Sequence, residues 1–277
     1  MKLNKDVCEL IGYYINNYEL LDWIDINKLD WSYLSSNEHI KAIELLKDNP
    51  KKICWSNLSE NKRGIEILKE NKNKIRWAML ALNNNGIKIL RDNKDKINWY
   101  FLSRNENAID LIKENMDKIN WDCLSLNTKA IELLKENKEK INWTFLSANK
   151  NGIELLKENQ DKIDWCYLSM NENGIELLKA NKEKINWTFL SANKNGIELL
   201  KENIEDIDWY YISRNENAIE IIKENLDKII WDELCMNKKA IDILKENQDK
   251  INWCKISQNE NIFRKIDKTE IIIKALT

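Results

Sequence analysis

Residues 143–164 read WTFLSANKNGIELLKENQDKID, and this 22-residue pattern governs most of the chain. Its Trp recurs every 22 residues without a slip, and one further Trp stands 24 residues before the first of the regular series. We count positions from the Trp of each unit, so that Leu146 stands at +3. The Trp residues of the pattern are Trp31, Trp55, Trp77, Trp99, Trp121, Trp143, Trp165, Trp187, Trp209, Trp231 and Trp253.

Each unit is expected to form two short helices. The residue before the Trp is Asn or Asp in most units, which is the residue type that caps a helix N-terminus. Trp and the Leu at +3 then share one helix face. The Asn at +6 recurs in every unit and suits the turn that ends this helix, because Asn tolerates the left-handed conformation and bonds to nearby backbone. The first helix is short enough to be either α or 3₁₀. A second helix is expected at 151–158, where Ile153, Leu155 and Leu156 form one apolar stripe.

Neither helix can bury its own apolar face, so neighbouring units must stack and form ladders of Trp, Leu and Ile. We therefore predict an all-α fold, an α-solenoid (superhelix) of short helix-turn-helix repeats. The tandem array covers 31–259, as ten units plus one partial unit. Residues 1–30, with a helix from Val7 to Tyr18, are expected to form an N-terminal cap, and 260–277 a C-terminal cap helix. The position of Gly152 is Gly or Ala in every full unit, which indicates close helix approach rather than positive φ.

The composition gives no sign of catalysis. The 46 acidic and 44 basic residues nearly cancel, so bulk attraction to nucleic acid or to a membrane is not indicated. The chain has one His, so a Ser-His or Cys-His arrangement would need His39, which we expect in a solvent loop within the two-residue insertion of 38–41. The six Cys contain no CxxC pair and occupy different slots, so we expect neither a metal site nor a disulfide. We predict no enzyme activity and no cofactor.

The start of the chain lacks the pattern of a signal peptide, and no run of about 18 apolar residues is present. We therefore expect a cytoplasmic location and no contact with a membrane.

The motif carried by Ile163-Asp164-Trp165, Leu168-Ser169, Asn171 and Leu177-Leu178-Lys179 resembles a tandem repeat found in proteins of giant DNA viruses of the mimivirus type. The resemblance covers 31–259. Many copies in that family have Pro after the Asn, whereas only Asn49-Pro50 does here. Most of those proteins lack an assigned biochemical role, so the resemblance implies an origin and little mechanism. It implies the cytoplasm of an infected host cell, with a host factor as one candidate partner.

The positions that vary within this constant frame are +1, +2 and +5. From 145 to 211 the +2 position is an aromatic stripe. Aromatic, Met and Arg side chains are typical of protein interface cores. The alternative is that the stripe is half-buried between the short helices, and both interpretations remain open. The candidate partner-binding residues are Tyr100, Phe101, Arg104, Phe145, Tyr167, Met170, Phe189, Tyr210, Tyr211 and Arg214.

We predict a non-enzymatic scaffold that binds a protein partner through these variable positions. One alternative is a single-stranded nucleic-acid binder that stacks bases on the aromatic stripe, against which the near-zero charge argues. The other is a structural protein that self-associates end to end. The Lys or Arg at +14 of each full unit is flanked by acids, which favours a solvated, neutralised face over a nucleic-acid surface.

Overall fold

The computed structural model describes residues 18–266 and confirms the all-α solenoid. In every unit the first helix begins at the Trp. The Asn or Asp before the Trp caps it, as in Asn142, whose Oδ1 accepts a hydrogen bond from the Phe145 amide at 3.1 Å. These first helices are α2 (Trp31–Leu34), α4 (Trp55–Glu60), α6 (Trp77–Leu82), α8 (Trp99–Ser103), α10 (Trp121–Ser125), α12 (Trp143–Ala148), α14 (Trp165–Ser169), α16 (Trp187–Ala192), α18 (Trp209–Arg214), α20 (Trp231–Leu234) and α22 (Trp253–Ile256).

The second helix starts one residue after the small Gly or Ala in the nine full 22-residue units, and at Ile40 in the longer first unit. A Cβ on Gly152 would lie 2.9 Å from both the carbonyl oxygen and Cδ1 of Leu146, and the φ of Gly152 is −80°, so close approach and not backbone conformation selects the small residue. These helices are α3 (Ile40–Asp48), α5 (Ile65–Glu70), α7 (Ile87–Arg91), α9 (Ile109–Lys113), α11 (Ile131–Glu136), α13 (Ile153–Glu158), α15 (Ile175–Lys179), α17 (Ile197–Lys201), α19 (Ile219–Glu224) and α21 (Ile241–Glu246).

Short 3₁₀ helices, which we did not predict, connect these elements. Most follow the second helix and lead to the next Trp: η1 (Pro50–Lys52), η2 (Lys72–Lys74), η3 (Lys94–Lys96), η5 (Lys138–Lys140), η6 (Gln160–Lys162), η7 (Lys182–Lys184), η8 (Ile204–Asp206) and η11 (Gln248–Lys250). Three others precede the second helix: η4 (Glu106–Ala108), η9 (Glu216–Ala218) and η10 (Lys238–Ala240). The last, η12 (Glu260–Ile262), follows α22 in a unit that has no second helix.

The Asn at +6 joins neighbouring units. Asn149 is buried, and its Nδ2 donates to the carbonyls of Ser125 (2.9 Å) and Asn127 (3.1 Å) in the preceding unit. Its Oδ1 accepts from the Asn151 amide of its own turn at 3.0 Å. No residue in 18–266 has positive φ, so the expected left-handed turn was wrong: this Asn is selected by hydrogen bonding between units. The Asn at +16 instead bonds its own helix, as Asn159 Nδ2 does to the Leu155 carbonyl at 2.8 Å.

A Ser at +4 forms a second ladder between units. Ser147 is fully buried and donates from Oγ to the Trp143 carbonyl at 2.8 Å. The same Oγ accepts the Asp164 amide of the next unit at 3.0 Å. Half-buried Trp side chains flank these ladders, and a Lys ammonium lies over most of them, as Lys162 does 4.6 Å from the Trp143 ring.

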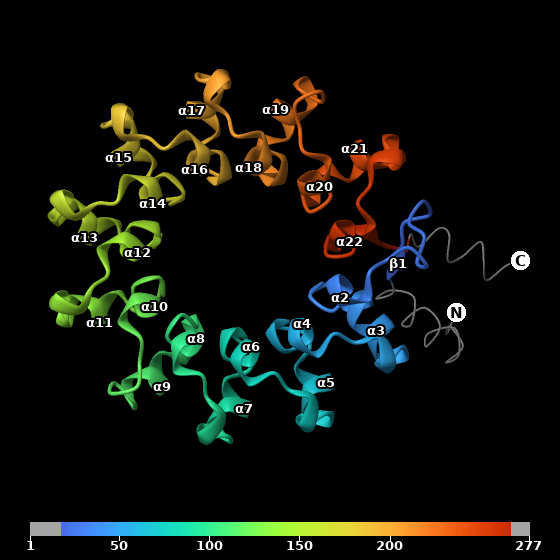
Figure 1. Ribbon diagram of the computed structural model, residues 1–277, viewed down its shortest axis with the longest axis horizontal. Helices are drawn as coiled ribbons and strands as arrows, with labels where there is room; N and C mark the ends of the chain where they lie inside the picture. Colours follow the sequence, from blue (N-terminus) through green and yellow to red (C-terminus); the bar gives the residue numbers. More distant parts are fainter. Residues whose placement is uncertain (1–17, 267–277) are drawn as a thin grey trace, which may run out of the picture.

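The solenoid closes into a ring, which the sequence did not lead us to expect. Figure 1 shows the first helices (even numbers) around the inside of the ring and the second helices (odd numbers) around the outside, with α22 beside α2. Asn37 Nδ2 donates to the carbonyls of Ser257 (3.0 Å) and Asn259 (3.2 Å), so the first unit stacks on the last as other neighbours do. We call the place where the two ends of the described chain meet the seam. The amide of Asp30 donates to Ser257 Oγ at 2.8 Å, which continues the Ser ladder across the seam.

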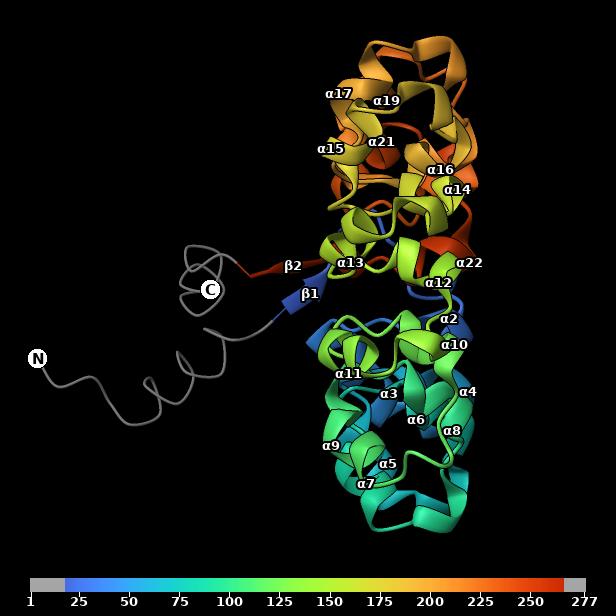
Figure 2. The ribbon, with the colours of Figure 1, turned by 90° about the vertical axis from the view of Figure 1, so that its left-hand side faces the viewer.

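The two ends of the chain together complete the eleventh unit. That unit begins at Trp253, and residues 21–30 supply its second half, because Lys28 lies 5.0 Å over the Trp253 ring just as Lys162 lies over Trp143. Strands β1 (Tyr18–Leu20) and β2 (Phe263–Lys265) pair antiparallel in the place of a second helix. Both strands project from one face of the ring (Figure 2).

The expected caps therefore differ from what the structure describes. Within 18–30 and 260–266 the structure has these two strands and the turn η12, and the remaining parts of 1–30 and 260–277 lie outside the described residues. The predicted helix from Val7 to Tyr18 lies outside them too, apart from Tyr18 in β1. The surfaces that end-to-end self-association would use are paired with each other inside one chain.

Candidate functional site

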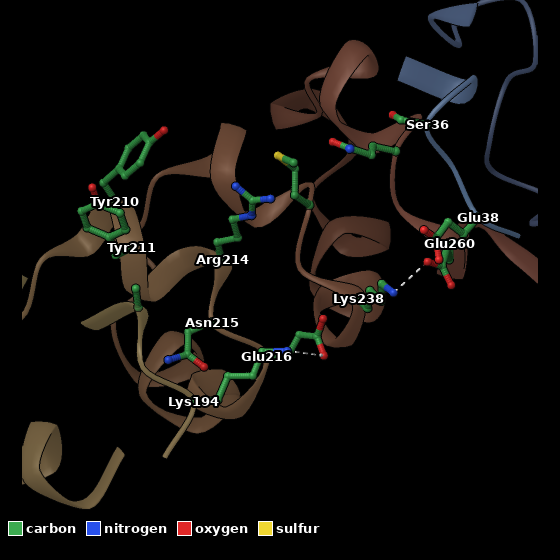
Figure 3. Close-up of a pocket in the computed structure, with 13 residues that line it drawn as sticks. Ser36, Glu38, Lys194, Tyr210, Tyr211, Arg214, Asn215, Glu216, Lys238 and Glu260 are labelled. Carbon is green, nitrogen blue, oxygen red and sulfur yellow. Dashed lines mark hydrogen bonds and ion pairs between the residues drawn. The ribbon is translucent and has the colours of Figure 1, made fainter. Parts of the chain in front are cut away.

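The inner wall of the ring is built from position +5, at or just after the end of each first helix, and from position +7 in the turn beyond it, together with parts of +1 and +2. A cavity of about 760 Å³ extends along five units of this wall and crosses the seam. Figure 3 shows Arg214 between the tyrosines Tyr210 and Tyr211 and the neighbouring Lys238. Arg104 at +5 lines a second hollow of about 370 Å³ on the inner wall with Met170. The wall thus collects side chains that differ between units.

The predicted aromatic stripe is continuous along this wall. Ring centres of Phe145 and Tyr167 are 6.1 Å apart, those of Tyr167 and Phe189 are 6.2 Å apart, and those of Phe189 and Tyr211 are 6.4 Å apart. All four rings are half-buried, as is Phe101 in an earlier unit. The stripe therefore packs against itself and also leaves part of each ring accessible, which combines the two interpretations that the sequence left open.

The most exposed aromatics are at +1 rather than +2. Tyr100 is 56% exposed and Tyr210 is 51% exposed, and each packs edge-to-face on the aromatic residue that follows it, Phe101 or Tyr211, at 5.2 and 5.3 Å. Each tyrosine is thus held by its neighbour while most of its own ring faces solvent. Such rings contribute contact area to a partner at low cost in side-chain entropy.

The spacing of the stripe sets the width of the ring's interior. The three steps of 6.1–6.4 Å between these four rings, extended to eleven equal steps around a circle, correspond to a circumference of about 70 Å and a distance of about 22 Å across the interior at position +2. Subtracting the thickness of the rings leaves about 15–18 Å, whereas an α-helix with its side chains is about 10–12 Å across. The interior is therefore wide enough for one helix or an extended chain and too narrow for a folded domain.

Position +7 is a set of wall residues that we missed. In the cavity that crosses the seam it alternates in charge from Lys194 through Glu216 and Lys238 to Glu260, and a second glutamate, Glu38, follows on the other side of the seam. Lys238 pairs with Glu260 at 2.9 Å and Lys194 approaches Glu216 at 3.9 Å. The alternation of Lys and Glu between units was visible in the sequence, but nothing there showed that +7 shares a surface with +5.

Two units replace the aromatic stripe with an ion pair. Glu233 is buried at +2 and its carboxylate pairs with the Lys255 ammonium of the next unit. The hydrogen bond that Lys255 donates to the Glu233 carboxylate raises the pKa of Lys255. Because both charges are compensated, this part of the stripe offers no free charge to a ligand.

His39 does not lie in a solvent loop, so that expectation was wrong. It caps α3 by accepting the Lys41 amide on Nδ1 at 3.1 Å, and its ring stacks on Phe263 at 4.7 Å with Tyr18 edge-on at 4.6 Å. Burial lowers the pKa of His39, against the carboxylate of Glu260. The two-residue insertion thus places the imidazole between β1 and β2 at the seam, where it has a structural role.

The cysteines of 18–266 are free thiols. Burial raises the pKa of Cys235 to about 11, and its sulfur accepts the Asn252 amide at 3.4 Å, so it stands in the Ser ladder. No group of three His, Cys, Asp or Glu residues within the described part of the chain is placed to hold a metal ion.

The outer wall is charged and neutralised. The Lys at +14 pairs with the Glu at +11 of the same helix, for example Lys157 with Glu154 at 2.9 Å and Lys179 with Glu176 at 3.0 Å. Arg91 instead reaches Glu114 of the next unit at 2.9 Å. These pairs confirm the predicted solvated face, and exposed pairs of this kind contribute little binding energy.

Comparisons with known proteins found no match. No protein-family model matches the chain, and it matches neither a curated protein nor a solved structure. Among the helices of 18–266, none has the length and apolar character needed to cross a membrane.

Proposed function

We propose that this protein is a non-enzymatic, ring-shaped scaffold that holds a segment of a partner protein in its interior. The observation that carries the proposal is the location of the variable positions. Residues at +5 and +7, with the tyrosines at +1, converge on the inner wall, while the outer wall repeats the same Glu–Lys pairs in most units. A surface that varies inside a constant frame is suited to specific recognition.

The composition of the wall supports a polypeptide as the ligand. Tyr210, Arg214 and Met236 surround the same cavity, and these residue types are enriched at the centres of protein interfaces. Paired Lys and Glu side chains at +7 supply both donors and acceptors. The width of the interior limits the bound part to a helix or an extended segment, so the rest of the partner lies outside the ring.

The resemblance to the giant-virus repeats suggests a setting for this function. We propose that the protein acts in the cytoplasm of an infected cell, where the partner is a viral protein or a host factor. The ring closure makes a single ring, rather than an end-to-end polymer, the working unit of this proposal.

Site-specific photocrosslinking tests the function directly. A photoreactive phenylalanine analogue replaces Met236 on the inner wall or, as the matched control, Lys201 on the outer wall, and each protein is irradiated in the producing cell. We expect a protease-sensitive adduct from position 236 and none from position 201. Adducts from the outer wall alone would overturn the proposal, and so would an inner-wall adduct that nuclease removes.

A further inference from the structure

The interior carries two copies of one side-chain cluster on opposite sides. The units at Trp99 and Trp209 have Tyr at +1, an aromatic residue at +2 and Arg at +5, a combination that no other unit has. Five units separate them along one arc of the ring and six along the other, so α8 and α18 face each other across the interior (Figure 1). The clusters are Tyr100, Phe101 and Arg104 on one side, and Tyr210, Tyr211 and Arg214 on the other.

Both arginines are exposed cations without an ion-pair partner among residues 18–266. Within residues 18–266 neither Arg104 nor Arg214 makes an ion pair or a side-chain hydrogen bond, whereas Lys194 and Lys238 on the same wall each have a Glu partner. A guanidinium beside an exposed tyrosine ring offers bidentate hydrogen bonding and an apolar surface together. The matching group on a ligand is a carboxylate on an aliphatic stem.

We propose that the segment held in the ring is an acidic α-helix bound at two opposed points, with one carboxylate at Arg104 and Tyr100 and another at Arg214 and Tyr210. This inference rests on the function proposed above and names the chemistry of the partner. A helix of about 10–12 Å in an interior of about 15–18 Å leaves a few ångströms on each side, which the long Arg side chains span.

The wall disfavours a nucleic acid in the same place. Two positions after each Arg stands a glutamate, Glu106 after Arg104 and Glu216 after Arg214. A polyanion carries a charge at every nucleotide and would bring phosphates against these carboxylates. A helix can place single carboxylates at the two arginines and neutral or basic residues beside the glutamates, so the charge pattern selects a peptide.

Fluorescence anisotropy with a defined probe tests the inference. The probe is a labelled, alanine-based 18-residue helical peptide with Glu on two opposite faces, and the matched control peptide carries Lys instead. We expect the Glu peptide to bind the parent ring and the Lys peptide to bind at least 10-fold more weakly. R104A and R214A should each weaken the Glu peptide about 10-fold, and the double variant about 100-fold. The outer-wall variant K179A should bind like the parent.

A variant with both arginine charges reversed separates a loss of binding contacts from a loss of folding. The variant R104E/R214E, with both changes at exposed positions, should prefer the Lys peptide while its circular dichroism stays that of the parent. The inference is overturned if the Glu peptide does not bind, if only one Arg matters, or if labelled oligo(dT) binds through the same arginines. If the Glu peptide does not bind but position 236 still gives a protein adduct, the proposed function stands and only the identification of the segment as an acidic helix is rejected.

Discussion

At the scale of single residues, the Asn at +6 is the most constrained part of the repeat. Its amide satisfies two carbonyls of the preceding unit, and its carbonyl oxygen satisfies one amide of its own turn. Replacement of Asn149 by Ala leaves these buried groups without partners. We expect N149A to lower the free energy of unfolding by about 2–4 kcal/mol, measured by urea titration followed by circular dichroism.

A neighbouring Asn provides the control. Asn151 is exposed, and its Nδ2 makes one bond to the Thr128 carbonyl at 2.9 Å. N151A should cost no more than about 1 kcal/mol, because water replaces the lost donor. Equal losses in N149A and N151A would show that burial between units does not decide the role of the Asn at +6.

His39 makes the seam sensitive to pH. Burial between Tyr18 and Phe263 lowers its folded pKa, Glu260 and Glu44 oppose the shift, and Arg63 adds to it. A lowered folded pKa means that the unfolded chain binds the proton more tightly. The stabilisation by neutral His39 is then fully present above the ordinary pKa of about 6.5 and is lost as the pH falls through the folded value.

The variant H39N isolates this effect. Asn keeps the capping acceptor for the Lys41 amide and cannot be protonated. We expect thermal unfolding of the parent to shift to lower temperature from pH 7.5 to pH 5.5, and H39N to show a smaller shift over the same range. Identical pH profiles for the two proteins would contradict the assignment of this dependence to His39.

At the scale of the elements, the helices could be predicted from their capping residues, whereas the 3₁₀ turns that connect them and the two strands could not. Asn or Asp before the Trp of most units marks a helix start, and the side chain does cap it, as at Asp164. The 3₁₀ turns such as η6 escaped prediction because three residues carry no periodicity. Strands β1 and β2 escaped it for another reason: each is three residues long, and its partner lies at the other end of the chain.

The pairing of β1 with β2 allows an engineered disulfide that would join the two strands covalently. Glu19 and Arg264 are directly opposite in the antiparallel register, and their side chains form an ion pair at 2.8 Å. The amide of Leu21 donates to the Ile262 carbonyl, so these two residues are a hydrogen-bonded pair of the antiparallel ladder. Such pairs recur every two residues along the strands, so Glu19 and Arg264 are the next hydrogen-bonded pair, with Cα atoms about 5.5 Å apart. This distance lies in the range of a disulfide.

We expect E19C/R264C to form this bond on oxidation. A crosslink between the chain ends restricts the unfolded state most strongly when the loop is long, by up to about 5 kcal/mol for one of this length. The oxidised protein should run faster in non-reducing gels and unfold at higher urea concentration than the same protein after reduction. An oxidised sample whose unfolding matches the reduced one would show that the two strands do not hold the ends together.

At the scale of the whole molecule, the sequence predicts stacking but not closure. Curvature accumulates from a rotation of roughly 33° per unit when eleven units complete a circle, and no single residue encodes that rotation. Closure also requires Lys28 and Asp30, which precede Trp31 and so the first unit, to act as part of the missing half of the last unit. Read along the chain, they resemble part of a cap.

The candidate site was predictable to the same extent. Variation at +1, +2 and +5 singled out Tyr210 and Arg214 as contact residues, and both line the inner-wall cavity. The facing of Arg104 and Arg214 could not be predicted, because an open superhelix would place units five apart on successive turns or along an arc. Only a closed ring brings them to opposite sides of one enclosed space.

Closure has a consequence for dynamics, because the eleventh unit is the one unit of the ring whose two halves, the half that begins at Trp253 and the half formed by 21–30, are not joined by a peptide bond. The hydrogen bonds of the seam match those of the other joints: the Asp30 amide meets Ser257 Oγ at 2.8 Å, and the Asp164 amide meets Ser147 Oγ at 3.0 Å. When a joint inside the array opens, the chain still holds its two sides together, whereas the two halves of the eleventh unit can separate while the other ten units stay folded. Opening at the seam therefore needs the least free energy.

Amide hydrogen exchange compares these two matched amides. We expect Asp30 to exchange faster than Asp164 in the reduced E19C/R264C protein, and to approach the rate of Asp164 once the disulfide forms. Asp164 itself should be unaffected by oxidation, since its joint is far from the seam. If Asp30 is already as protected as Asp164 without the disulfide, the ring opens only by global unfolding, and a partner segment must thread through it from one end.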